Sequence, residues 1–524
     1  MNMKPKLFFN TTGPCNPDKH YMLKPQERLV GAQLDRYIRN RLYWVLHAPR
    51  QVGKTTFLKS WVREINTGGE AVACYVSVES SRNIPEPERS MPAICNAIKD
   101  SAKISGLPVP QESITDPLSL LKNILINWSE LISPKPLIVL FDEVDVLIDG
   151  TMISFVSQLR EGFNWRDIGT FPVSIALVGM RDLKDYIIAS TGGREPNPGS
   201  SFNIKEDSAL LSNFSKEDVK RLFAQRTFEI GQQITPEAID YVFEQSQGQP
   251  WIVNSLFKRA TLQILGEESA EKVTLEHIAQ ARENMIMARE THLDALGARL
   301  KEPRIRRVVE SVITGEMNPD LGRTNDDVML AMDLGLVQWT SETGLKISNP
   351  IYTEILTRHL NSGYHDILPP PASWKWQTPD GSIDMDKLLK EFQKFWKRHA
   401  DKWEEKADYT EAFPHLLLQA FLQRVLNGGG SIERECAAGR GRMDLGIEFN
   451  DHYHIIEIKL VRDHDSPQSI REEGLEQIRD YRDKFSPNTP AYLMIFDRRS
   501  KAKEKTWDER ITWENDDEVT VVGC

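Results

Sequence analysis

A lysine and a threonine stand directly after a glycine-containing turn near residue 50. Residues 48–55 have the sequence Ala-Pro-Arg-Gln-Val-Gly-Lys-Thr. In such a turn, backbone N–H groups face phosphate oxygens, Lys54 neutralises phosphate charge and Thr55 holds Mg²⁺. Ala48 stands at the position where phosphate-binding loops of this kind (Walker A loops) usually have their first glycine. An ordinary turn with an exposed lysine is the simpler alternative, but the apolar segment before the turn and the amphipathic segment after it favour a nucleotide-binding loop.

An acidic pair ends an apolar segment further along the chain. Residues 137–145 have the sequence Leu-Ile-Val-Leu-Phe-Asp-Glu-Val-Asp. Phosphoryl transfer depends on positioning and charge neutralisation. We therefore predict that Asp142 binds Mg²⁺, directly or through water, and that Glu143 orients or deprotonates the attacking water. Asp145 is interpreted as an acid at the start of a helix rather than as a ligand.

Polar residues also follow the next apolar segment, 173–180. In STAND and AAA+-like ATPases, which this region resembles, a polar residue after this strand senses the γ-phosphate. The resemblance makes Arg181 and Asp182 candidates for that role, and a solvated loop pair is an equal alternative. Arg194 is a candidate for acting across a subunit interface. The residues predicted to contact the nucleotide are Ala48, Pro49, Arg50, Gln51, Val52, Gly53, Lys54, Thr55, Thr56, Asp142 and Arg181.

A second group of charged residues lies near the C-terminal end of the sequence. Asp444 precedes Glu457 by thirteen positions, and Lys459 follows Glu457 by two. Because side chains alternate along a strand, we predict Glu457 and Lys459 on one face. Two carboxylates suit Mg²⁺ or Mn²⁺, which would polarise a phosphate and activate water, while the lysine would position that water and stabilise the transition state. A charged sheet edge is the alternative.

Other residues could complete this second site. Gln477 and Tyr481 lie four positions apart on a predicted helix and share one face. Upstream, Glu411 could approach the metal, whereas His415 is better interpreted as a surface histidine and Glu435 as a solvated charge. Five arginines either contact phosphates or form a solvated face: Arg440, Arg442, Arg462, Arg471 and Arg479.

This C-terminal pattern resembles the PD-(D/E)XK nuclease superfamily over roughly residues 405–500, with Met443 where the family name has proline. The Gln-x-x-x-Tyr pair resembles its RecB-like branch. The resemblance implies catalytic roles for Asp444, Glu457, Lys459 and Gln477. It also implies metal ligation by Asp444, Glu457 and Ile458. At the first site, the predicted metal ligands are Thr55 and Asp142.

Apolar segments alternate with helical ones over the first part of the chain. Strands are predicted at 43–48, 71–80, 136–147 and 173–180, which is typical of a parallel sheet covered on both faces. With the nucleotide motifs, this region resembles STAND and AAA+-like ATPases over roughly residues 25–300. The sequence Gly248-Gln249-Pro250-Trp251 resembles the break in their helical lid and is expected to be structural.

The fold class is therefore predicted as α/β, with a P-loop ATPase sheet, a helical lid, a winged helix and a separate α/β nuclease domain. The proline-rich stretch before residue 384 has the composition of a semi-rigid linker. The predicted divisions are the ATPase core 1–215 with an irregular lead-in over 1–30, the lid 216–300, the winged helix 301–361, the linker 362–383 and the nuclease domain 384–524.

Bulk properties limit the class of protein. A chain of 524 residues corresponds to about three or four domains. The net charge of −11 argues against a protein that coats nucleic acid along its whole surface, but not against a local basic channel. Five scattered cysteines form neither a disulfide framework nor a zinc motif, which fits a reducing cytoplasm. The sequence contains no apolar run that is long enough to predict a membrane span.

The favoured interpretation is an ATP-binding and ATP-hydrolysing switch that controls a metal-dependent DNA endonuclease. The family resemblance suggests antiphage defence. ATP and Mg²⁺ are the expected cofactors, with Mn²⁺ as an option at the nuclease site. Expected partners are DNA, with RNA still open, further copies of the chain, and an activating protein or nucleic acid. The alternatives are a DNA-transacting motor with an accessory nuclease, and a regulatory ATPase with an inactive nuclease fold.

Overall fold

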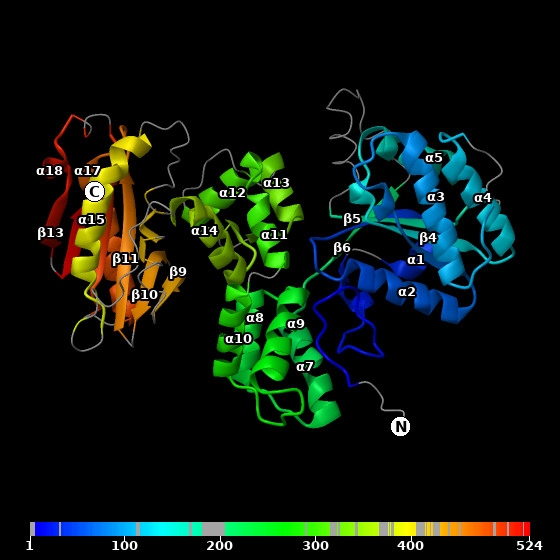
Figure 1. Cartoon of the computed structure of the whole chain (residues 1–524), viewed down its shortest axis with the longest axis horizontal. Coiled ribbons are helices and arrows are strands. Elements are labelled where there is room, and N and C mark those ends of the chain that lie inside the picture. Colours follow the sequence, from blue (N-terminus) through cyan, green and yellow to red (C-terminus); the bar gives the residue numbers. More distant parts are fainter. Residues whose placement is uncertain are drawn as a thin grey trace. The chain divides into compact units, whose positions relative to one another are not determined.

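The fold is taken from a computed structural model of the chain (Figure 1). The structure describes residues 6–30, 33–111, 116–166, 170–180, 205–288, 291–314, 322, 325–340, 344–365, 376, 378, 382–404, 414, 417–419, 421–422, 430–438, 441–449, 452–485, 489–499, 502, 504–516 and 518–524. Contacts within the chain group it into two compact units. One comprises residues 1–309 and 319–355, and the other comprises residues 310–318 and 356–524.

Six strands of the N-terminal unit form one sheet. Its order is β1 (Leu29–Val30), β6 (Lys205–Leu211), β2 (Tyr43–His47), β5 (Ser174–Gly179), β4 (Leu137–Asp142) and β3 (Val72–Ser77). All neighbours run parallel except β1 and β6, which are antiparallel. The four predicted apolar strands are confirmed. The sequence analysis missed β6, whose first residues are polar.

Helices cover both faces of this sheet, which explains why its central strands are apolar throughout. On one face, α3 (Pro87–Ile104), α4 (Leu120–Ile132) and α5 (Asp149–Phe163) pack against alternate strand residues. On the other face, α1 (Leu34–Arg39) and α2 (Lys54–Gly68) do so (Figure 1). Parallel strands end at one edge, so the residues after β2, β3, β4 and β5 meet there.

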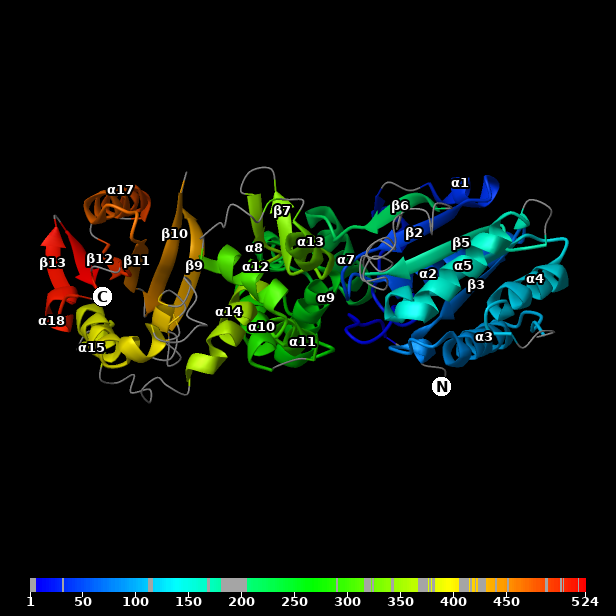
Figure 2. The ribbon, with the colours of Figure 1, turned by 90° about the horizontal axis from the view of Figure 1, so that it is seen from above.

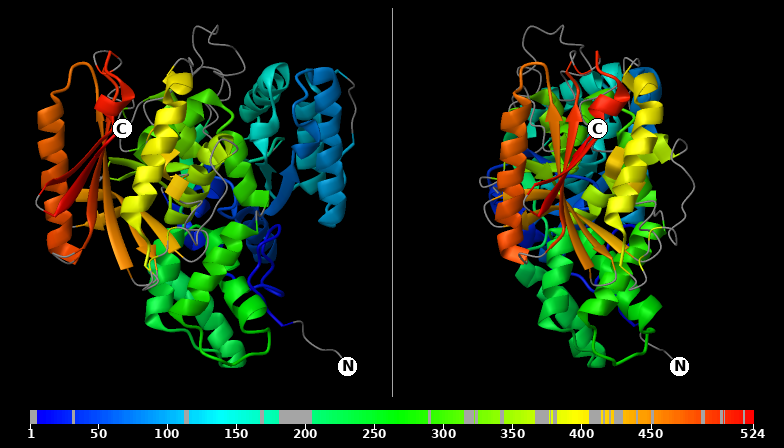
Figure 3. Two further views of the ribbon diagram at one scale, coloured as in Figure 1. Left: turned by 60° about the vertical axis from the view of Figure 1, so that its left-hand side comes forward. Right: turned by 90° about the vertical axis from the view of Figure 1, so that its left-hand side faces the viewer.

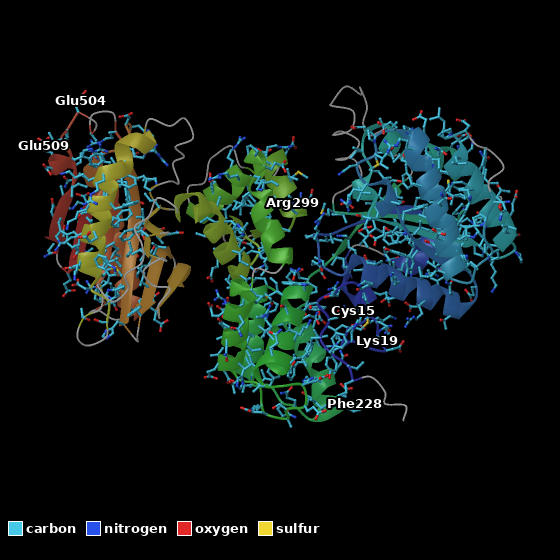
Figure 4. The ribbon with its side chains drawn as sticks, in the orientation of Figure 1. Cys15, Lys19, Phe228, Arg299, Glu504 and Glu509 are labelled. Carbon is cyan, nitrogen blue, oxygen red and sulfur yellow. The ribbon has the colours of Figure 1, made fainter. Side chains whose placement is uncertain are left out.

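The lead-in is more than an irregular tail, because residues 6–28 pack against two parts of the unit. Phe9 is buried between aromatic rings of the helices that follow the sheet, Phe223 and Phe257. Cys15, labelled in Figure 4, donates its backbone N–H to Thr56 Oγ1 of α2 at 3.0 Å. The segment therefore joins the start of α2 to the helical part of the unit.

The helical part that follows the sheet begins at Ser215, which caps α7 (Lys216–Ile230) in a reciprocal capping box with Asp218. The other helices are α8 (Pro236–Ser246), α9 (Pro250–Lys258) with a π-helical extension over Arg259–Ile264, α10 (Leu275–Met287) and α11 (Thr291–Arg299). The predicted break between helices lies at Gly248. This residue has φ +71°, and its carbonyl accepts a hydrogen bond from Phe214 N at 2.8 Å.

Gly248→Ala is expected to destabilise the N-terminal unit by more than about 3 kcal/mol. An added Cβ would lie 1.8 Å from the carbonyl oxygen of Phe214, a backbone atom that cannot rotate away. The matched control is Gly231→Ala, which has φ +79° but no atom within 4 Å of the new Cβ. It should lose only about 1 kcal/mol for the left-handed backbone. Denaturant unfolding of both variants measures the difference, and equal losses would contradict the close approach.

Three helices and one pair of strands lie in the described part of the region that is predicted as a winged helix. They are α12 (Pro303–Thr314), α13 (Asp326–Asp333), the antiparallel pair β7 (Val337–Thr340) and β8 (Gly344–Ile347), and α14 (Pro350–His365). Their grouping as a winged helix remains a prediction. Most of the predicted linker 362–383 lies outside the described residues.

The C-terminal unit contains a second sheet. Its order is β13 (Thr512–Asp516), β14 (Val519–Gly523), β12 (Ala491–Asp497), β11 (His452–Val461), β10 (Gly441–Phe449) and β9 (Gly430–Ala438). The central strands β11, β12 and β14 run parallel, and the outer pairs run antiparallel. The apolar segments 453–461 and 491–497 form β11 and β12, whereas the polar strand β13 was not predicted from the sequence.

Two long helices cover opposite faces of this second sheet (Figures 2 and 3). On one face α15 (Met385–Glu404) packs its apolar side against Ile456, Ile458 and Met494. On the other, α17 (Pro467–Phe485) packs against Ile455 and Leu493. The alternation along β11 therefore directs its odd-numbered residues toward α17. The short helix α18 (Trp507–Arg510) precedes β13.

His454 is a buried histidine on the α15 side of β11. Its exposed fraction is 7%, and neither ring nitrogen has a hydrogen-bond partner among the described residues. Burial, with a smaller contribution from the charge of His452, lowers its pKa to about 4, although Asp386 opposes the shift. The ring is therefore neutral in the folded unit, and protonation favours the unfolded chain.

His454→Leu is expected to reduce the acid sensitivity of the C-terminal unit. In the parent, the contribution of the neutral His454 ring to the free energy of unfolding is complete above pH 6.5, the ordinary pKa of histidine. About 3 kcal/mol of that free energy is lost as the pH falls from 6.5 to about 4, because the unfolded chain binds a proton that the folded unit does not. The variant should lose less stability over the same interval. The control is His464→Leu, because that side chain is 76% exposed. Unfolding curves recorded between pH 7.5 and 4 give the free energy of unfolding of each variant. An identical pH dependence of that free energy in the parent and in His454→Leu would refute the interpretation.

Within the described residues, no helix is both long and apolar enough to cross a membrane.

Candidate functional site

The first candidate site is built on the loop between β2 and α2. Gly53 precedes α2 with φ +98°, a conformation that glycine adopts without strain. Ala48 lies at the start of the loop and donates its N–H to Gly179 O, at the end of neighbouring β5, at 3.4 Å. The loop thus sits at the edge where the parallel strands end, with the positive N-terminus of α2 beside it.

Lys54 reaches back across this loop. Its Nζ donates to the backbone oxygens of Ala48 at 2.6 Å and Pro49 at 2.9 Å. Burial lowers the pKa of Lys54 to about 8, with Asp145 and Asp142 opposing the shift. The loop therefore encloses an ammonium group whose partners are backbone carbonyls, and the oxygens of a phosphate are stronger acceptors for it.

The predicted metal ligands of this site lie in direct contact. Thr55 Oγ1 donates to Asp142 Oδ2 at 2.7 Å, and Tyr75 OH from adjacent β3 donates to the same oxygen at 3.2 Å. Asp142 is only 2% exposed. A hydroxyl and a buried carboxylate are the hard oxygen ligands that Mg²⁺ takes beside nucleotide phosphates.

Glu143 lies next to this pair in an unusual backbone conformation, with φ +62°. Its carboxylate accepts a hydrogen bond from Ser77 Oγ at 2.7 Å. Burial raises the pKa of Glu143. Sequence reasoning missed Ser77, although its position at the carboxyl end of the strand beside β4 was a usable signal. Asp145 lies one turn further, in the short 3₁₀ helix Val144–Val146, and burial raises its pKa against the opposing charge of Lys54.

Arg28 is a second residue that sequence reasoning missed, and its side chain contacts the backbone of the loop. One of its terminal guanidinium nitrogens donates to Val52 O at 2.6 Å, and the group lies 4.8 Å from the centroid of the Phe214 ring. The side chain is buried, and burial lowers its pKa to about 10. Arg28 precedes a strand of two residues, so no periodicity in the sequence marked it.

The remaining loop residues have different environments. Val52 is buried and Arg50 is exposed, while Gln51 O accepts a hydrogen bond from Gln249 Nε2 at 3.4 Å. Thr56 binds the lead-in through Cys15. Three predicted residues lie outside the described residues: Arg181, Asp182 and Arg194.

The second candidate site lies on the face of the C-terminal sheet that α17 covers. Asp444 lies inside β10 rather than at its end, and its Oδ2 accepts a hydrogen bond from Ile458 N of β11 at 2.8 Å. Lys459 Nζ lies 3.3 Å from Glu457 Oε1. The structure therefore brings together the three charged residues that the strand alternation and the family resemblance singled out.

The carboxylate of Glu457 is short of donors. Its side chain is 4% exposed, and Oε2 has no hydrogen-bond partner among the described residues. Burial, and then the charge of Asp444, raise its pKa to about 8. Gln477 Oε1 is another buried acceptor without a described donor. A cation would satisfy acceptors that the protein leaves unpaired, so the residues fit a metal ion.

Ile458 can contribute only through its backbone, because its side chain packs into the core on the α15 face. Among the described residues, no three His, Cys, Asp or Glu side chains cluster as a metal site. A metal ion would therefore combine the carboxylates of Asp444 and Glu457 with backbone, water or substrate oxygens.

Tyr481 lies on α17 beside this cluster. Burial raises the pKa of its hydroxyl, and the charges of Glu457 and Asp444 add to the shift. Arg471 pairs with Glu514 at 2.9 Å and Asp516 at 3.1 Å, and therefore belongs to an ion-pair group. Arg479 is exposed. Several predicted side chains lie outside the description: Glu411, His415, Glu435, Arg440 and Arg442.

One family model matches the part of the chain that contains the second site. Residues 409–492 match the family model described as the PD-(D/E)XK nuclease superfamily. This segment contains Asp444, Glu457, Lys459 and Gln477. A search of curated proteins finds no match.

Solved structures resemble the N-terminal part. The Walker-type ATPase of Pyrococcus abyssi is 14% identical, with a TM-score of 0.48, over 66% of this chain and 99% of that one. The Aeropyrum pernix ORC2 protein is 15% identical, with a TM-score of 0.33, over 62% and 91%. The Thermotoga maritima RuvB Holliday junction branch migration motor is 13% identical, with a TM-score of 0.33, over 62% and 90%.

The parallel sheet, the loop around Lys54 and the Thr55–Asp142 contact are the features of a P-loop ATPase fold. The C-terminal domain belongs to the PD-(D/E)XK nuclease superfamily. The chain is thus a fusion of a P-loop ATPase with a nuclease domain.

Proposed function

We propose that this chain is an ATP-dependent switch that controls a metal-dependent DNA endonuclease. The observation that carries the proposal is the intact cluster of Asp444, Glu457 and Lys459 inside the segment that matches the nuclease family. A degenerate binding module would have no need of a buried carboxylate with one unpaired oxygen beside a lysine, because such a group costs stability.

In the nuclease domain, Asp444 and Glu457 would hold Mg²⁺ or Mn²⁺ with the backbone of Ile458. The bound ion would polarise the scissile phosphate and supply an activated water. Lys459 would orient that water and stabilise charge on the phosphate, and Gln477 would contact the same site from α17. Arginines around the domain would contact the DNA backbone, which predicts binding that weakens with salt.

In the ATPase, Lys54 and the loop 48–56 would bind the phosphates of ATP. Thr55 and Asp142 would hold Mg²⁺, and Glu143 would orient the attacking water. Arg181 would sense the γ-phosphate. The helices after residue 215 would act as a lid, and residues 301–361 as a winged helix. ATP would drive a STAND-like change of assembly among several copies in the cytoplasm, triggered by a protein or nucleic acid, and the family analogy suggests antiphage defence.

The decisive experiment incubates the purified chain with plasmid DNA and Mg²⁺ or Mn²⁺, with and without ATP. We expect metal-dependent cleavage whose rate depends on ATP. ATP turnover measured in parallel separates the switch from a DNA-transacting motor, because a switch hydrolyses slowly with or without DNA, whereas DNA accelerates a motor. Absence of cleavage under every nucleotide condition and with candidate triggers would reject the nuclease proposal.

A further inference from the structure

One residue near the second site was predicted neither from its motif nor from the family resemblance. Glu473 lies on α17, one helical turn before Gln477, and its Oε1 lies 3.1 Å from Lys459 Nζ. The same ammonium group lies 3.3 Å from Glu457 Oε1. Lys459 is therefore shared between a buried carboxylate on its own strand and a half-exposed one on the facing helix.

The contact exists because α17 lies unusually close to the sheet at its next residue. Gly474 is buried, and a Cβ there would be 2.5 Å from Leu493 Cδ1 and 3.3 Å from Lys459 Cγ. A larger residue would require the buried Leu493 side chain, or the helix itself, to shift. The glycine, which would otherwise weaken a helix interior, thus allows Glu473 to reach Lys459.

The two carboxylates have different surroundings. Glu457 Oε2 has no donor among the described residues, and the Glu457 side chain is 4% exposed, so it is the group that a cation would satisfy. Glu473 is 55% exposed and points at the amine from the helix side. Burial alone would lower the pKa of Lys459, but Glu457 and Glu473 outweigh it and raise that pKa. If a metal ion engaged the Glu457 carboxylate, Glu473 would still lie 3.1 Å from the ammonium group and could hold it.

We propose that Glu473 is a positioning residue that holds the Lys459 ammonium group in place while Asp444 and Glu457 bind the metal ion. This inference rests on the proposed nuclease function. Glu473 acts through Lys459 and touches neither the metal nor the scissile phosphate. Its loss should therefore slow cleavage without changing the affinity for metal or DNA.

The first test measures cleavage by the full chain with Mn²⁺. Glu473→Gln should lower kcat about three- to tenfold, the size expected for a half-exposed ion pair, with KM for DNA and the Mn²⁺ requirement unchanged. Glu473→Asp should recover part of the loss. Glu472→Gln is the matched control, because the Glu472 carboxylate accepts a hydrogen bond from Gln468 and should leave the rate unchanged. In a Lys459→Ala background, Glu473→Gln should have no further effect.

A second test does not depend on activity. The rate at which an acylating reagent modifies the Lys459 amine is measured by mass spectrometry of the full chain with Mn²⁺. Glu473→Gln should accelerate modification several-fold, and Glu472→Gln should not. Unchanged labelling in Glu473→Gln, or an equal rate loss in the Lys459→Ala background, would overturn the positioning role. A parent that cuts no DNA under any nucleotide condition or with candidate triggers would reject the nuclease proposal, while the labelling would still decide the role of Glu473.

Discussion

Lys54→Ala is expected to abolish tight ATP binding to the N-terminal unit. The amine is enclosed by the loop and donates to the backbone oxygens of Ala48 and Pro49, so its N–H donors are held inside the loop that would surround the phosphates. The Lys54 amine is thus a positive charge held between the loop and the start of α2. Alanine would remove this enclosed charge and leave mainly the backbone dipoles of the loop to face a highly charged phosphate chain.

The measurement is equilibrium binding of a fluorescent ATP analogue. Arg63→Ala is the control, because it removes an exposed cation from the same helix away from the loop. Glu143→Gln should bind ATP as the parent does and lose turnover, since Asp142 and Thr55 still hold Mg²⁺ but no carboxylate orients the water. Binding of ATP by Lys54→Ala with parental affinity would exclude the loop as the nucleotide site.

Spacing alone predicted much of this site. Lys54 and Thr55 follow one strand, and Asp142 and Glu143 end another, so a parallel sheet necessarily brings them to one edge. Arg28 could not be predicted in the same way. It precedes a strand of two residues, and its contact with Val52 depends on how the lead-in packs, which no local pattern encodes.

The same contrast holds in the C-terminal unit. Alternation along the strand predicts Glu457 and Lys459 on one face of β11, and the structure places them there. Glu473 was missed because a charged residue on a polar stretch of helix is usually solvated. The neighbouring Gly474 was the available signal, since glycine inside a helix indicates a close approach. The strand β13 was missed because its sequence, Thr-Trp-Glu-Asn-Asp, is polar at an exposed sheet edge.

Asp444→Ala is expected to reduce DNA cleavage below detection while ATP turnover survives. Asp444 and Glu457 are the two carboxylates of the site, and Ile458 N already fixes one oxygen of Asp444. Removing one of two anionic ligands should release the metal ion, which supplies the activated water. EDTA should give the same result in the parent, Mg²⁺ or Mn²⁺ should restore cleavage, and Ca²⁺ should bind with little turnover.

Lys459→Ala distinguishes the catalytic role of the lysine from that of the metal ion. It should keep the metal ion, because both carboxylates remain, yet cut about 10²–10³ times more slowly, the usual cost of one preorganised electrostatic contact. The matched control is Lys390→Ala, which removes an exposed amine from α15 on the opposite face of the sheet, 4.5 Å from the centroid of the Trp513 ring. That variant should cut as the parent does. The comparison requires a parent shown to cut, since a switch without its trigger is silent. If Lys459→Ala then cleaves DNA at the parental rate, the catalytic role assigned to this cluster is wrong.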